Sequence, residues 1–92
     1  LGHRIELGEI EAQVEQHADI TRAICIYDSN KKRILLFYVG NIEGKQLISE
    51  LRDVLPGYML PNKAFALDAF PMNKNGKVDR NALKELGGIK HA

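Results

Sequence analysis

One lysine stands in a context that favours an exposed position on a turn. Lys77 follows Asn75 and Gly76, and an Asn-Gly pair is a strong short-range signal for a tight turn. A lysine presented by such a turn can carry its ammonium to a phosphate or a carboxylate. Because exposed lysines beside Asn-Gly turns are also common in surface hairpins, this motif taken alone favours a solvated turn.

The three histidines and the single cysteine do not form a metal-ligand pattern. His3, His17 and His91 lie far apart, and neither they nor Cys25 have the spacing of a metal site. We therefore expect no metal ligands. His17 follows a predicted helix, where it can interact with the helix dipole or the last carbonyls. Cys25 falls in a predicted strand, where a small buried apolar residue is expected.

A group of carboxylates near the start of the chain has two interpretations. Glu6, Glu9 and Glu11 could form an acid/base cluster. However, negative charge at the N-terminus of a helix is a routine stabilising device, worth about 0.3–1 kcal/mol for each group. The structural interpretation is favoured.

Composition restricts the class of protein. The chain has 92 residues, 45% of them hydrophobic and 27% charged, which fits one small globular domain. Thirteen Lys and Arg against twelve Asp and Glu leave a net charge of +1, so we expect no nucleic-acid partner. The longest apolar run, residues 34–39, is far shorter than the roughly 20 residues of a membrane helix, so we expect no membrane partner. A lone cysteine suits a cytoplasmic location, and a start at Leu1 suggests a piece of a longer chain.

Two segments carry apolar residues at helical spacing. They predict amphipathic helices over residues 7–17 and 44–55, the second ended by Pro56. Asp79 is placed to cap a short last helix over residues 80–86.

Three further segments are rich in β-branched and aromatic residues. Residues 20–28 and 33–39 flank a turn-forming run and predict a β-hairpin, and residues 63–70 predict a third strand. The segment 33–39 is apolar on both faces, so it should be central and covered by a helix on at least one side. The predicted class is α+β: a small sheet of about three antiparallel or mixed strands packed against two main helices, with a terminal hairpin or loop and a short C-terminal helix.

Three segments taken together change the interpretation of Lys77. They are residues 2–11 (GHRIELGEIE), 55–61 (LPGYMLP) and 75–80 (NGKVDR). In this order and at these separations they resemble the eighth, ninth and tenth core motifs of nonribosomal peptide synthetase adenylation domains. The resemblance covers the chain to about residue 86. It implies that residues 1–86 are the C-terminal lid subdomain of an adenylate-forming enzyme, with residues 87–92 a tail or linker.

The resemblance also implies roles for particular residues. Lys77 matches the lysine that bridges the substrate carboxylate and the α-phosphate during adenylation. The eighth-motif loop, which approaches the adenylate and the phosphopantetheine during thioester formation, is matched by Gly2, His3 and Arg4. Asn75 and Gly76 would shape the lysine turn. Asp79 and Arg80 would support it, without a catalytic role.

The implied reaction joins ATP and an amino acid into an aminoacyl-adenylate with release of pyrophosphate, and then passes the acyl group to the phosphopantetheine thiol of a carrier protein. The implied partners are the N-terminal adenylation subdomain, a peptidyl or acyl carrier protein and the amino-acid substrate. ATP and Mg²⁺ would be bound mainly by the missing N-terminal subdomain. We therefore expect no cofactor on this chain by itself, and no activity from it alone.

Alternative functions remain open from the residues. The same kind of lid occurs in free-standing D-alanine carrier-protein ligases and in acyl-CoA synthetases. The latter usually carry a different eighth motif and Ser-Gly-Lys at the tenth. Synthetases often show a Thr two residues before Asn-Gly-Lys, whereas this chain has Asn73 and Lys74 there. A stand-alone α+β binding module is the remote alternative.

Overall fold

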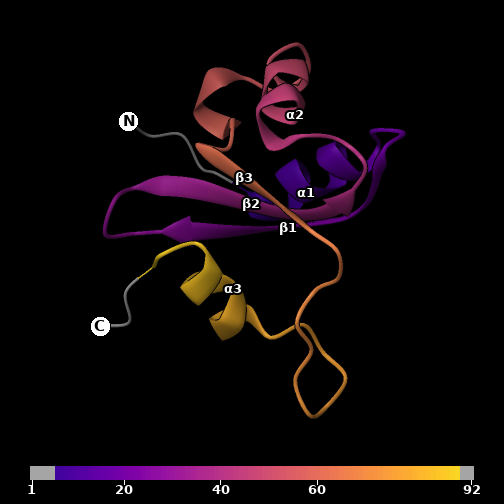
Figure 1. The fold of residues 1–92 in the computed structure, drawn as a ribbon. Helices are drawn as coiled ribbons and strands as arrows, with labels where there is room; N and C mark the ends of the chain where they lie inside the picture. The colour runs from indigo at the N-terminus through magenta and orange to yellow at the C-terminus, as the bar shows by residue number, and fades with distance from the viewer. Residues whose placement is uncertain (1–5, 90–92) are drawn as a thin grey trace.

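A three-stranded sheet forms the middle layer of the molecule (Figure 1). A computed structural model describes residues 6–89. Strands β1 (Ile20–Asp28) and β2 (Arg33–Gly40) form the predicted hairpin, and β3 (Lys63–Leu67) lies beside β2. The helices are α1 (Leu7–Glu15), α2 (Gly44–Leu51) and α3 (Arg80–Leu86), with a 3₁₀ turn, η1 (Gly57–Met59), before β3. The α+β class is confirmed.

The sheet is mixed. β1 pairs with β2 antiparallel, so that Cys25 lies opposite Leu36, whereas β2 pairs with β3 parallel, so that Phe37 lies opposite Phe65. The parallel pair requires a crossover connection, which α2 and η1 provide. The central position predicted for the second strand is confirmed.

Two apolar clusters lie on opposite faces of the sheet. On one face α1 and α2 pack against alternate residues of the hairpin, and Tyr38 is the largest side chain buried there. On the other face Leu83 of α3 packs against Leu35 and Phe37, and the ring of Phe37 stacks on that of Phe65 at 5.1 Å between centroids. Helices thus cover β2 on both sides, which explains why this strand is apolar on both faces.

Several elements end earlier than their sequence patterns predict. α1 stops at Glu15, because the next amides bond three residues back, as from His17 to Val14. α2 stops at Leu51, and looser turns carry the chain to Pro56. β3 stops at Leu67, which pairs with Val39 at the end of β2, so that later residues have no strand to pair with.

Glutamates of α1 close one edge of the sheet. The Glu11 carboxylate accepts a hydrogen bond from the Cys25 amide at 2.7 Å, and Glu15 accepts one from the Ala23 amide at 2.9 Å. β1 is an edge strand, and its outward N–H groups would otherwise offer a template for another strand. Glu11 therefore has a structural role, as the sequence favoured, but through the sheet edge rather than through the helix dipole.

Packing continues past residue 86, the predicted end of the subdomain. Gly87 is buried, and its carbonyl accepts a hydrogen bond from the Arg33 guanidinium at 3.2 Å. Ile89 packs on the cluster beneath α3, and its amide bonds the Lys84 carbonyl at 2.9 Å. Within residues 6–89 there is no helix long and apolar enough to cross a membrane.

Candidate functional site

Lys77 lies on a projecting loop between β3 and α3, drawn at the lower right of Figure 1. The base of the loop is an isolated antiparallel bridge between Met72 and Val78. Inside it, the Asn73 amide donates to the Lys77 carbonyl at 2.7 Å and the Gly76 amide to the Asn73 carbonyl at 3.1 Å. Gly76 has a φ of +77°, the left-handed conformation that glycine adopts at low cost. The loop is therefore a small closed hairpin with its lysine exposed.

The Asn73 side chain organises this hairpin from within. Its Oδ1 atom accepts hydrogen bonds from the amides of Asn75 at 2.8 Å and Lys77 at 3.1 Å. The sequence assigned the shape of the turn to Asn75 and Gly76 and gave Asn73 no role. The signal that could have found it is the tendency of an Asn side chain to bond the backbone two residues further on.

Asp79 connects the loop to the last helix. Its amide donates to the Pro71 carbonyl at 2.8 Å, and its carboxylate accepts from the Ala82 amide at 3.1 Å as the cap of α3. The cap predicted for the helix over residues 80–86 is thus present. The carboxylate of Asp79 is engaged in the backbone, so it holds the end of the loop rather than pairing with Lys77.

A hollow of about 540 Å³ opens beside the loop on the α3 face of the sheet. Arg80, the first residue of α3, and Arg22 of β1 both line it, and both are exposed. The Arg22 guanidinium lies 5.5 Å from the centroid of the Phe70 ring. Among the described residues, the lining of the hollow includes three cations and no carboxylate: Arg22, Ile24, Met72, Asn73, Gly76, Lys77, Val78 and Arg80. The sequence did not single out Arg22 or Phe70.

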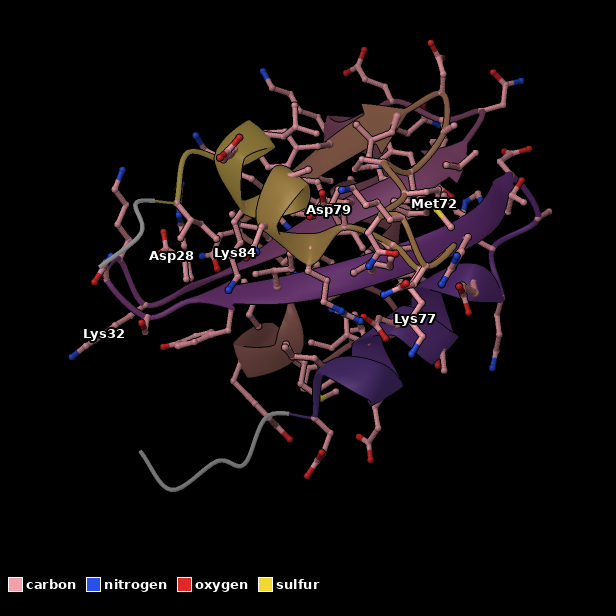
Figure 2. All side chains as sticks on the ribbon, turned by 90° about the horizontal axis from the view of Figure 1, so that it is seen from below. Asp28, Lys32, Met72, Lys77, Asp79 and Lys84 are labelled. Atoms are coloured by element: carbon pink, nitrogen blue, oxygen red, sulfur yellow. The ribbon has the colours of Figure 1, made fainter. Side chains whose placement is uncertain are left out.

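Figure 2 shows labelled residues toward both ends of the sheet, with Asp79 between them. Lys77 and Met72 lie at one end, whereas Asp28 and Lys32 lie at the other, where β1 turns into β2. The remaining predicted site residues Gly2, His3 and Arg4 fall outside residues 6–89, the part of the chain that the structure describes.

Two titratable side chains away from this loop, His17 and Glu50, contact each other, and a third, Cys25, is buried. The His17 ring lies 2.7 Å from Glu50 of α2 and accepts from the Asp19 amide at 3.1 Å, so it joins two helices instead of capping the carbonyls of α1. Hydrogen bonds from His17 and Gln46 lower the pKa of Glu50. Burial, with the Glu11 charge nearby, raises the pKa of Cys25 to about 12, so this buried thiol is inert at neutral pH.

Asp28 is the one buried charged residue among those described. Burial opposes its ionisation, but hydrogen bonds from Arg33 and from the Lys31 and Asn30 amides outweigh this and hold the pKa of Asp28 below its usual value. The Arg33 Nε atom lies 2.9 Å from the carboxylate. Within residues 6–89, no group of three His, Cys, Asp or Glu side chains is placed to hold a metal ion.

The chain matches the family model described as AMP-binding enzyme C-terminal domain over residues 9–77. It is 39% identical over 87 residues to malpibaldin synthetase of Mortierella alpina, covering 89% of this chain and 2% of that protein. With bacitracin synthase 3 of Bacillus licheniformis it shares 43% identity over 89 residues, or 91% of this chain and 1% of that protein. The chain thus spans a small fraction of the length of these relatives.

Among solved structures, a four-domain nonribosomal peptide synthetase bound to AMP and glycine superposes with a TM-score of 0.76 at 36% identity. The match covers 88% of this chain and 6% of that one. Sequence and fold therefore point to the same family.

Proposed function

Because this chain belongs to the family of AMP-binding enzyme C-terminal domains, we propose that it is the mobile lid of an amino-acid-activating adenylation domain in a nonribosomal peptide synthetase. The parent protein would join ATP and an amino acid into an aminoacyl-adenylate and pyrophosphate. It would then pass the aminoacyl group to the phosphopantetheine thiol of a carrier protein. Such a reaction takes place in the cytoplasm, where ATP and carrier proteins are available.

The observation that carries this proposal is the presentation of Lys77. Its ammonium stands on a hairpin closed by its own backbone and by Asn73, and the nearest acid in sequence, Asp79, is committed to capping α3. No ion pair joins Lys77 to any residue in the described part of the chain. The cation is therefore available to a ligand delivered by another subdomain.

The chemistry of adenylation explains why a free cation is useful. A carboxylate oxygen attacks the α-phosphorus of ATP, the bond from that phosphorus to the bridging oxygen breaks, and its electron pair leaves with pyrophosphate. Two negatively charged groups must approach each other, and charge builds up on the phosphoryl oxygens in the transition state. A lysine is a compact charge on a flexible stem, so it can offset both charges at once.

Other parts of the chain support or complete this role. Asn73 and Gly76 fix the hairpin that carries Lys77, and Asp79 fixes its junction with α3. The loop of Gly2, His3 and Arg4 would serve thioester formation, with Gly2 permitting close backbone approach and Arg4 supplying a cation. Mg²⁺ would accompany ATP on the N-terminal subdomain. The absence of a free carboxylate beside Lys77 among residues 6–89 supports placing Mg²⁺ on the other subdomain, because Asp79 is used to cap α3.

The test is acid-dependent exchange between ATP and pyrophosphate, measured on the full-length parent protein with a panel of amino acids and fatty acids. We expect exchange with an amino acid and a loss of about two orders of magnitude or more in Lys77→Ala. Lys74→Ala is the matched control, because Lys74 is an exposed lysine of the same loop. It should change the rate by less than about twofold. Normal exchange by a folded Lys77→Ala protein would overturn the assignment, and exchange only with fatty acids would overturn the substrate class.

A further inference from the structure

The cations of the hollow beside the Lys77 loop have no partner of opposite charge within residues 6–89. Arg22 makes only its contact with Phe70, and Arg80 and Lys77 pair with no described acid. Three like charges around one hollow repel one another, and the resulting positive potential attracts an anion. Arg33, by contrast, is paired: it bonds Asp28 and the Gly87 carbonyl.

Arg22 is held in a position from which it can bind a ligand. Its side chain lies on the α3 face of the sheet, the same face as Ile24 and Ile26 of β1. Helix α3 is only seven residues long, and it covers these two isoleucines without burying Arg22. The Phe70 ring lies under its guanidinium. A guanidinium over an aromatic ring is attracted by the ring face, and its N–H groups that point away from the ring can still donate to phosphate oxygens.

We propose that Arg22 and Arg80 form, with Lys77, a binding site for the pyrophosphoryl group in the hollow at the base of the Lys77 loop. The hollow, of about 540 Å³, is open to solvent and has room for a diphosphate group. The two guanidinium groups offer paired donors, and Lys77 adds a point charge. This inference rests on the proposed function in one respect: the ligand is identified with the leaving group of ATP.

The direct experiment is a titration of the isotope-labelled 92-residue chain with inorganic pyrophosphate at constant ionic strength, followed by NMR. Saturable shifts are expected at the amides of residues 73–80 and at the Arg22 side chain. Arg22→Gln and Arg80→Gln should each raise the Kd about fivefold or more. Arg52→Gln, which removes an exposed arginine beyond the end of α2, should change the Kd by less than about twofold.

A phosphate monoester distinguishes the two sources of phosphate in the parent reaction. Free phosphopantetheine should bind more weakly than pyrophosphate, because it carries fewer charged oxygens. Tighter binding of phosphopantetheine would overturn the assignment to the leaving group. Absence of saturable shifts at about 10 mM pyrophosphate, or an equal loss in Arg52→Gln, would overturn the site itself.

The parent protein separates this inference from the proposed function. In the exchange assay Arg22→Gln should raise the KM for pyrophosphate about fivefold with kcat little changed, whereas Lys77→Ala should act on kcat. Suppose that Lys77→Ala abolishes exchange while Arg22→Gln leaves the KM for pyrophosphate unchanged. The pyrophosphate site in the hollow is then overturned, and the proposed lid function stands. If pyrophosphate binds the hollow but Lys77→Ala exchanges at the normal rate, the pyrophosphate site stands and the adenylation role of Lys77 is overturned.

Discussion

The arginines at the two ends of the sheet differ in burial and in pairing. At the turn from β1 to β2, Arg33 is largely buried and bonds both Asp28 and the Gly87 carbonyl. At the other end, Arg22 and Arg80 stay exposed around the Lys77 hollow, and neither pairs with an acid within residues 6–89. A buried charge is tolerated only when it is paired, so the first end is closed by necessity. The second end can leave its cations unpaired because they are exposed and water solvates them.

On the proposed function, the closed end of the sheet stabilises the fold and the open end binds the reacting groups. Asp28 and Arg33 join the β-hairpin to the end of α3, whereas the Lys77 loop is held by hydrogen bonds within residues 71–79 and projects from the body of the fold (Figure 1). Substitutions at the closed end should therefore change folding without changing the reaction. Substitutions of the exposed Lys77, Arg22 and Arg80 side chains at the open end should change the reaction with little effect on folding.

The largest effect on folding is expected from Asp28→Asn, because it leaves the largely buried Arg33 charge without its counter-charge. The folded pKa of Asp28 lies below 3.8, so its carboxylate stabilises the native state above that pH, and this contribution is lost as the pH falls through the folded pKa. Urea unfolding should show a large deficit for the variant at pH 7 that narrows below pH 3.8. A deficit that is constant with pH would contradict the charge pairing.

A second effect is expected where α3 meets the sheet. A Cβ atom on Gly87 would lie 2.7 Å from Leu35 Cδ1 and 3.0 Å from Phe37 Cζ, and both side chains are fully buried. Gly87→Val should cost about 1–3 kcal/mol of unfolding free energy by overpacking. The control is Gly8→Ala in α1, where the added methyl meets nothing within 4 Å and helix propensity should raise stability. Equal stability of Gly87→Val and the wild type would contradict the close packing of Gly87 against the sheet.

The smallest effect on folding is expected at Gly76, on the open end. Its added Cβ meets nothing, but its φ of +77° disfavours other residues, so Gly76→Ala should cost about 1 kcal/mol. Gly76→Asn should cost less, because Asn tolerates this conformation. Urea unfolding measures the cost, and the exchange assay should show Gly76→Asn closer to the wild type than Gly76→Ala. Identical behaviour of the two variants would mean that the turn is not held as described.

The sequence predicted the layout of the fold because each element carries a local pattern. The two-sided apolar segment of β2 required a central strand, and Asp79 marked the start of α3, whereas α2 ends at Leu51, before the Pro56 that was expected to end it. The early end of β3 was missed, because it depends on where β2 stops rather than on any residue between 67 and 70. Propensity alone does not report the length of the partner strand.

The candidate site was predictable only in part, for a similar reason. A turn motif in the sequence identifies Gly76 and Lys77. Asn73 could have been predicted as well, because Asn side chains tend to accept hydrogen bonds from backbone amides two residues further on. Arg22 and Phe70 meet only because the fold brings β1 beside the segment after β3. No local spacing in the sequence predicts the contact between Arg22 and Phe70.

The central claim is tested most directly by comparing Lys77→Ala and Asp28→Asn in the same parent protein, measuring both the exchange rate per folded molecule and the urea midpoint. We expect Lys77→Ala to lose about two orders of magnitude in rate with an unchanged midpoint. Asp28→Asn should lower the midpoint and leave the rate per folded molecule intact. A folded Lys77→Ala protein that exchanges at the wild-type rate would contradict the account.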